Sequence, residues 1–155
     1  MSKSLKRVRQ ALRDAGLPDT TFEAGEARTA EQAAGACGCA LDQIVKSIIF
    51  AGQDSGAVRL FLTAGGNRVS AEKASELAGE ALTRADGQLV RATTGFAIGG
   101  VSPVGHLTPS PIWMDPRLTA FATVWAAAGT PRHVFSIAPQ ALITLTSATL
   151  ADFIE

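Results

Sequence analysis

The sequence lacks the features that define several protein classes. It has only two cysteines, Cys37 and Cys39, and their spacing is too short for an ordinary disulfide or for the paired ligands of a structural zinc site. We therefore expect two small buried residues in an alanine- and glycine-rich helix. No apolar run reaches the roughly 18 residues of a membrane span, and the basic start has no signal-peptide core. These absences predict a cytoplasmic protein.

Motifs for nucleotide or metal chemistry are also missing. The sequence contains no phosphate-binding loop of the Walker type and no dinucleotide-binding glycine fingerprint. Its two histidines, His106 and His133, have no partner at metal-ligand spacing. Ser102, His106 and Asp115 suggest a hydrolase triad, but the nucleophile-elbow pattern is absent around Ser102. We therefore expect no metal and no cofactor, and either simple hydrolysis or binding alone.

An excess of charge of either sign is likewise absent, since 14 basic residues balance 14 acidic ones. The whole molecule therefore has no net positive electrostatic field that would indicate a nucleic-acid partner. The distribution is less even, because the first sixteen residues hold five cations, Lys3, Lys6, Arg7, Arg9 and Arg13. This segment either contacts a phosphate backbone or is a solvated helix face, and the sequence leaves both interpretations open.

The length of 155 residues and an apolar content of 46% suit one domain, spanning residues 1–155. Apolar spacing and capping residues predict helices at about 3–15, 30–37, 71–77, 87–93 and 139–145, and a last helical turn capped by Thr149. Apolar, β-branched runs predict strands at 20–23, 44–50, 58–63, 112–114, 121–127 and 133–137. Without a regular βαβ repeat, the expected fold class is α+β, a mixed sheet or partial barrel flanked by helices.

Lys46 stands out because it lies in the most apolar strand of the sequence. Alternation along a strand places it on the same face as Ile44, Ile48 and Phe50. A buried ammonium is costly unless something compensates for its lost hydration. Lys46 therefore either lines a cleft or extends to the edge of the sheet, and the sequence leaves these two possibilities open.

The segment Gly95–Gly105 is too rich in glycine for a helix, and its proline would interrupt a strand. Such a loop lets backbone N–H groups approach a carbonyl oxygen or a phosphate without obstruction by side chains. Taken alone, a glycine cluster of this kind is more often a tight connection between two elements.

Taken together, the strand at 45–50 and the loop at 94–105 resemble the YbaK/prolyl-tRNA synthetase-associated domain family. The segments 111–115, 121–125, 128–129 and 138–139 follow the order found in that family, so the resemblance covers about residues 25–155. Members of the family are editing domains that hydrolyse the ester between a mischarged amino acid and transfer RNA. The resemblance therefore implies a deacylase whose substrate is an aminoacyl-tRNA.

The resemblance also implies a set of site residues. Lys46 matches the family's functional lysine, and Gly99–Pro103 matches its Gly-x-x-x-Pro loop. We expect the loop N–H groups to stabilise an oxyanion, Lys46 to orient the terminal nucleotide or its ester, and water to attack. The predicted catalytic residues are Lys46, Gly99, Gly100, Val101 and Ser102. The predicted substrate-binding residues in the matched region are Ile98, Pro103 and Gly129. Lys3 and Arg7 are added as substrate-binding residues because of the basic charge of the first helix, which lies outside the resemblance.

The amino acid removed stays open among cysteine, serine, threonine and alanine. A prolyl-tRNA synthetase is a second partner that the resemblance raises, and the oligomeric state is not indicated. Two alternatives remain: a non-catalytic tRNA-binding module associated with a prolyl-tRNA synthetase, and an esterase or amidase for small molecules.

Overall fold

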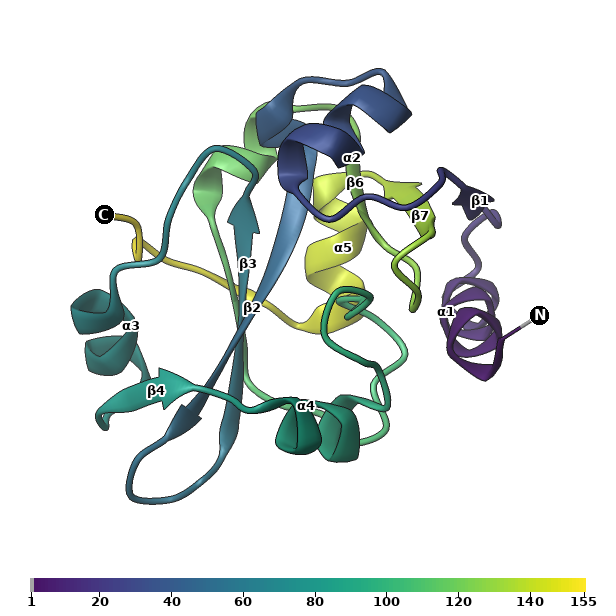
Figure 1. The fold of residues 1–155 in the computed structure, drawn as a ribbon. Coiled ribbons are helices and arrows are strands. Elements are labelled where there is room, and N and C mark those ends of the chain that lie inside the picture. Colours follow the sequence, from purple (N-terminus) through teal and green to yellow (C-terminus); the bar gives the residue numbers. More distant parts are fainter. Residues whose placement is uncertain (1) are drawn as a thin grey trace.

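The computed structural model describes residues 2–155, which form five α-helices, two short 3₁₀-helices and eight strands (Figure 1). The helices are α1 (Lys3–Asp14), α2 (Ala30–Cys37), η1 (Leu41–Gln43), α3 (Ala71–Ala78), α4 (Gly87–Thr94), η2 (Pro116–Ala120) and α5 (Pro139–Thr146). The strands are β1 (Phe22–Glu23), β2 (Ile44–Gly52), β3 (Val58–Ala64), β4 (Leu82–Arg84), β5 (Ile112–Met114), β6 (Val124–Ala127), β7 (His133–Ile137) and β8 (Thr149–Leu150). Within residues 2–155 no helix combines the length and apolar character needed to cross a bilayer.

All eight strands belong to one mixed sheet, which confirms the predicted fold class. The order is β1-β7-β6-β2-β3-β5-β8, and β4 pairs separately with β2. The pairs β2–β6, β3–β5 and β5–β8 are parallel, whereas the others are antiparallel. On one edge, β2 pairs with β6 at Ile44–Val45 and with β4 at Phe50–Gly52. The residues between these two pairings, 46–49, face a gap in the sheet.

The predicted helix caps at Thr29, Ser70 and Asp86 are confirmed. Each side chain accepts a hydrogen bond from the backbone N–H three residues further on, at 3.1, 3.2 and 2.8 Å. These bonds satisfy donors that have no partner inside the helix. The caps fix where α2, α3 and α4 begin, and α2 and α4 both contribute to the cavity described below.

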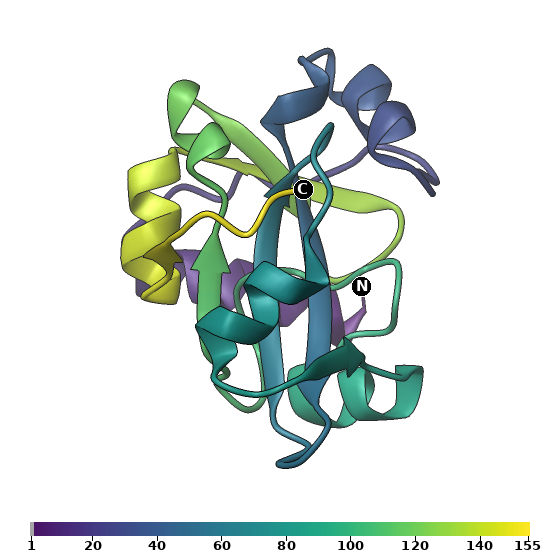
Figure 2. The ribbon, with the colours of Figure 1, turned by 90° about the vertical axis from the view of Figure 1, so that its left-hand side faces the viewer.

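Helices cover both faces of the central strands (Figure 1). On one face, a large core cluster includes Leu5, Val8 and Leu12 of α1, which are at most 3% exposed. On the other face, α3 crosses in front of β2 and β3 (Figure 2), and a smaller cluster joins it to Phe61 and Phe153. The amphipathic first helix is therefore an integral part of the core.

Two sequence-based predictions are wrong at the level of single elements, and one strand was not predicted. The predicted helical turn after Thr149 is instead β8, which pairs in parallel with β5. The strand predicted from Phe121 begins only at Val124, because Asp115 caps a 3₁₀-helix that occupies residues 116–120. The strand β4 was not predicted, since its three residues gain their structure by pairing with β2.

The two cysteines are free thiols, and both are partly exposed rather than buried. Cys37 is the last residue of α2, whereas Cys39 lies beyond the helix. Partial burial, together with the neighbouring Cys39 thiol, raises the pKa of Cys37 to about 11. Because the thiolate is the reactive form, neither cysteine has the properties of a nucleophile at neutral pH.

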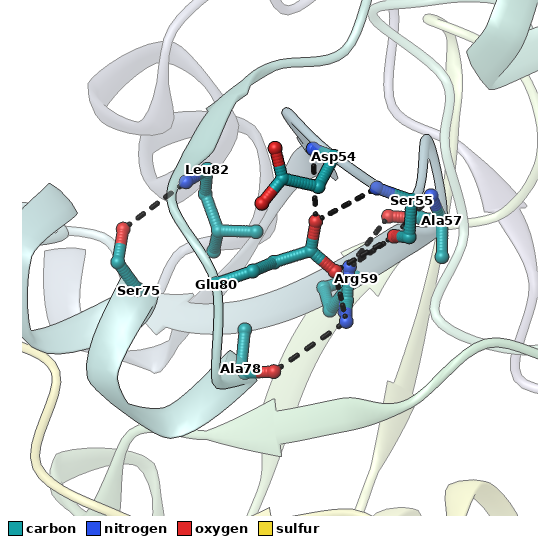
Figure 3. A network of polar contacts seen from close by, with 8 residues as sticks. All are labelled: Asp54, Ser55, Ala57, Arg59, Ser75, Ala78, Glu80 and Leu82. Atoms are coloured by element: carbon teal, nitrogen blue, oxygen red, sulfur yellow. Dashed lines mark hydrogen bonds and ion pairs between the residues drawn. The ribbon is translucent and has the colours of Figure 1, made fainter.

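Glu80, which follows α3, anchors the turn between β2 and β3 (Figure 3). Its Oε1 accepts hydrogen bonds from the backbone N–H groups of Asp54 and Ser55, at 3.2 and 3.0 Å. Its Oε2 accepts from the Ser55 hydroxyl at 2.7 Å and forms an ion pair with Arg59 at 2.9 Å. The bonds from Ser55, followed by those from Arg59 and Asp54, lower the pKa of Glu80 from 4.5 to about 2.

The Glu80→Gln variant is expected to be less stable than wild type near neutral pH and equally stable near pH 2. A carboxylate whose pKa is lowered on folding stabilises the protein above its unfolded pKa of 4.5, and this contribution is lost as the pH falls towards 2. Thermal unfolding of both proteins at several pH values between about 7 and 2 tests this. Asp152→Asn, which removes the exposed ion pair with Lys73, is the control with a small expected effect. A deficit of Glu80→Gln that persists at the acid end would contradict the assignment.

Candidate active site

A cavity of about 380 Å³ opens beside the gap in the sheet edge. Its walls come from residues 44–49 of β2, the start of α2, the strand β6, the turn around Thr130 and the glycine loop after α4. These segments are distant in sequence, and the pairing of β2 with β6 and β4 brings them together. The volume falls within the range typical of small-ligand sites.

Lys46 lines this cavity, which decides between the two interpretations left open by the sequence. Its Nζ donates a hydrogen bond to the backbone carbonyl of Asn67 at 2.5 Å. Partial burial, the largest effect, lowers the pKa of Lys46, whereas the carboxylates of Glu31, Asp115 and Asp42 oppose this shift. An ammonium has three donors, so two remain for a ligand or for water after the bond to Asn67.

Asp115 holds the segment that anchors Lys46. It is 2% exposed, and its carboxylate accepts hydrogen bonds from Ala64 N, Asn67 Nδ2 and Arg117 N at 3.1, 2.9 and 2.9 Å. These bonds fix the turn that presents the Asn67 carbonyl to Lys46. Asn67 was not predicted from the sequence, although the Gly65-Gly66-Asn67 turn after a strand was a visible signal.

The triad of Ser102, His106 and Asp115 is not assembled. The Ser102 hydroxyl accepts from the Val104 N–H at 3.2 Å, and His106 Nε2 contacts the Ser102 backbone carbonyl at 2.6 Å. The Asp115 carboxylate instead accepts a hydrogen bond from Asn67 Nδ2. Burial lowers the pKa of His106, which favours a neutral imidazole packed against the loop.

The glycine loop packs tightly against the turn at Thr130. Gly99 has a φ of +97°, a conformation that side chains other than glycine rarely adopt. A Cβ atom at Gly100 would lie 2.8 Å from the Thr130 backbone. Ser102 is fully buried, whereas Ile98 is 63% exposed beside the cavity. The glycines therefore permit a close approach between two backbone segments.

The first helix supports this loop from behind. Arg7 donates hydrogen bonds to the carbonyls of Gly105 and Thr94 at 3.2 and 3.4 Å, and its guanidinium lies 4.6 Å from the centre of the Phe96 ring. A Cβ atom at Gly129 would lie 2.7 Å from the Ser4 carbonyl oxygen. Arg7 and Gly129 thus join α1 to the loop and to the neighbouring turn.

The structure brings together part of the predicted site. Four predicted residues line the cavity: Lys46, Ile98, Gly99 and Val101. The other six lie outside this lining: Gly100, Ser102, Pro103, Gly129, Lys3 and Arg7. The roles assigned to all ten residues stay predictions.

Several polar or aromatic residues of the cavity wall were not predicted as site residues from the sequence, among them Trp125, His133 and Ser47. Trp125 lines it and packs edge-on against Phe22, with ring centres 5.5 Å apart. His133 lines it too, and its Nδ1 lies 2.7 Å from the Thr130 hydroxyl. Ser47 lines it, and its Oγ is buried without a hydrogen-bond partner among residues 2–155.

The structure defines an α+β protein with a mixed sheet. The sheet has a gap at one strand edge, and the cavity beside this gap, lined by a partly buried lysine and a glycine loop, has the size of small-ligand sites. The chain belongs to the aminoacyl-tRNA editing domain family, whose model matches residues 24–145. This match confirms the resemblance seen in the sequence.

Curated relatives and solved structures agree with this family. YwhH of Bacillus subtilis (strain 168), an uncharacterized protein, is 32% identical over 123 residues, which cover 79% of this chain and 77% of YwhH. EbsC of Enterococcus faecalis (strain ATCC 700802 / V583), a candidate Cys-tRNA(Pro)/Cys-tRNA(Cys) deacylase, is 26% identical over 128 residues, covering 80% and 76% of the two chains. The crystal structure of a candidate trans-editing enzyme for prolyl tRNA synthetase has a TM-score of 0.92 at 46% identity, covering 100% of this chain and 99% of that one. The hypothetical protein APE2540 has a TM-score of 0.87 at 27% identity, covering 96% and 99%.

Proposed function

We propose that this protein is a trans-editing deacylase, which hydrolyses the ester between a mischarged small amino acid and transfer RNA. The observation that carries the proposal is that Lys46 and the glycine loop line one cavity of about 380 Å³. A volume of this size suits an aminoacyl group and part of the ribose to which it is esterified. The similarity to EbsC and to the candidate trans-editing enzyme supports cysteinyl-tRNA and prolyl-tRNA synthetase as the first substrate and partner to test.

The proposed reaction is hydrolysis. A water oxygen forms a bond to the ester carbonyl carbon, the bond from that carbon to the ribose oxygen breaks, and the ribose oxygen takes a proton. Backbone N–H groups of Gly99, Val101 and Ser102 stabilise the oxyanion that develops on the carbonyl, whereas the Gly100 N–H donates to the Ala97 carbonyl at 3.0 Å and shapes the loop. Lys46 orients the terminal nucleotide or its ester through the donors that Asn67 leaves free. The substrate's own 2′-hydroxyl helps to activate the water.

A deacylation panel tests the proposal. Purified protein is incubated with cysteinyl-, alanyl-, seryl-, threonyl- and prolyl-tRNA, and with the bare amino-acid esters. Release of a small amino acid from tRNA but not from the bare ester is the expected result. Release from both substrates would indicate a small-molecule esterase instead. Binding of tRNA without release of any amino acid would indicate the non-catalytic module.

Contact with the tRNA backbone is expected at the outer face of α1. Lys3 and Lys6 are exposed, and Lys6 borders a groove of about 520 Å³ that Arg13 also lines. Arg7 is unsuited to a test by charge reversal, because it bonds to the loop carbonyls. The lysines are therefore the informative positions.

The double variant Lys3→Glu/Lys6→Glu is expected to weaken tRNA binding about tenfold, and to reduce the slope of log affinity against log salt by about 2. The turnover number of bound substrate should change little, since neither lysine lines the cavity. Filter binding at several salt concentrations measures this. Lys73→Ala, on α3 across the sheet, is the control. An unchanged salt slope would indicate that the basic residues form a solvated helix face and do not contact tRNA.

A further inference from the structure

Ser47 occupies the centre of the gap in the sheet edge. On one side of it, β6 pairs with β2 only as far as Val45. On the other side, β4 pairs with β2 from Phe50 onwards, and the Ala85 N–H extends this contact to the Ile49 carbonyl at 3.2 Å. Ser47 therefore lies between two strands that both end short of it, beside the cavity that it lines.

The register of the sheet fixes the direction of the Ser47 backbone groups. Ser47 lies opposite Leu62 of β3, and the Leu62 carbonyl accepts from Asp115 N at 2.8 Å, on the side away from β2. In an antiparallel ladder, opposite residues turn their backbone groups either towards each other or both away. Ser47 therefore turns its N–H and C=O away from β3 and into the gap. The Ile49 carbonyl, two residues on, points to the same edge, as alternation requires.

Ser47 thus presents three unpaired polar groups to one place. Among residues 2–155, neither β4 nor β6 pairs with Ser47, and no backbone hydrogen bond outside these ladders reaches its N–H or C=O. Among residues 2–155, its hydroxyl oxygen is the one buried side-chain nitrogen or oxygen atom without a hydrogen-bond partner. Buried polar groups in proteins are almost always paired, and an unpaired cluster calls for an explanation such as a ligand.

We propose that Ser47 binds the aminoacyl group of the substrate as if that group were one residue of an antiparallel strand. The occupant's identity rests on the function proposed above. An aminoacyl ester carries an ammonium donor and a carbonyl acceptor on either side of one carbon, as a residue does in a hydrogen-bonded antiparallel pair. The ammonium donates to the Ser47 carbonyl, and the ester carbonyl accepts from the Ser47 N–H. This N–H then assists the loop donors in stabilising the oxyanion.

The Ser47 hydroxyl selects the side chain of the bound amino acid. In a hydrogen-bonded pair, the two side chains lie on the same face about 5.5 Å apart between Cα atoms. On that face Ser47 is flanked by Val45 and Ile49, which belong to the same apolar cluster as Val90 and Val101. A short side chain with a hydroxyl or thiol pairs with the Ser47 hydroxyl there, whereas a methyl group does not. The geometry therefore favours serine, cysteine or threonine over alanine.

Turnover by Ser47→Ala tests the selection. The variant is expected to lose about tenfold in kcat/KM for seryl- or cysteinyl-tRNA, while alanyl-tRNA changes little, because one hydrogen bond of ordinary strength is lost. Its melting temperature should not fall, since the substitution removes a hydroxyl that has no partner among residues 2–155. Ser136→Ala, on β7 outside the cavity lining, is the matched control. Equal losses for all substrates, or no loss, would overturn the selective role.

A binding measurement separates this inference from the proposed function. The probe is adenosine carrying a serine through a 3′-amide, which is not hydrolysed, added to ¹⁵N-labelled protein. The Ser47 amide resonance is expected to move downfield, and the adenosine without its seryl group should not cause this shift. If tRNA is deacylated but the Ser47 amide does not respond, the inference falls and the function stands. If the amide responds but no tRNA is deacylated, the function falls and the binding mode stands. If no tRNA is deacylated and the Ser47 amide resonance does not move, both the proposed function and the binding mode are overturned.

Discussion

The Lys46→Ala variant is expected to lose at least about 100-fold in kcat/KM for whichever aminoacyl-tRNA the wild type deacylates, the scale seen when one preorganised donor is removed from a reaction site. The Lys46 ammonium is held in place by the Asn67 carbonyl, so its free donors reach the cavity without a search over rotamers. Alanine removes the charge and all the donors together. Single-turnover deacylation with saturating protein measures the effect on the chemical step.

Two further variants make the Lys46 result interpretable. Lys46→Arg keeps the positive charge but offers a planar fork in place of a compact ammonium, so partial activity is expected. Lys73→Ala removes a lysine from α3, outside the cavity lining, and should behave as wild type. Full activity of Lys46→Ala, with an unchanged melting temperature, would exclude Lys46 from the reaction.

Gly100→Ala is expected to reduce deacylation by about 100-fold, because donors in a reaction site must be placed to within a fraction of an ångström. The added Cβ would lie 2.8 Å from the Thr130 backbone, which cannot move aside as a flexible side chain could. The loop must therefore shift away from the turn and carry the Gly99 and Val101 backbone with it. Such overpacking also costs about 1–3 kcal/mol of stability. Deacylation rates and thermal unfolding measure the two effects.

Gly35→Ala provides the matched control. Gly35 lies inside α2, a helix whose first residues line the same cavity, and a Cβ there meets no atom within 4 Å. Alanine in a helix interior should stabilise the protein by about 0.5–1 kcal/mol and leave deacylation unchanged. If Gly100→Ala retained full activity, the loop donors would have no part in the proposed reaction.

The elements with strong local signals were predicted from the sequence. Amphipathic spacing, side-chain caps and, for α5, the proline at its first turn located the five α-helices of residues 2–155, because these signals act over a few residues. The short strands β4 and β8 were missed, since two or three residues become strands only through a partner elsewhere in the chain. The interpretation of Thr149 as a helix cap failed for this reason.

The site was predicted in part for the same physical reason. Lys46 in an apolar strand and the glycines at 95–105 are unusual within their own segments, so the sequence marked them. Asn67 and Ser47 are unremarkable in sequence, and their importance depends on which strands pair and where the pairing stops. Arg7 illustrates the opposite case, since its charge suggested a substrate contact, whereas in the structure it bonds to the carbonyls of Gly105 and Thr94.

The attachment of α1 to the loop has a consequence for how the protein can be shortened or fused to another. The family model begins at residue 24, yet Leu5, Val8 and Leu12 fill the core, and Arg7 holds the far side of the loop. A version trimmed to the matched segment would expose an apolar face and free two loop carbonyls from their donor. A functional chimera built from this protein must therefore carry its first helix, even though the cavity itself is formed by later residues.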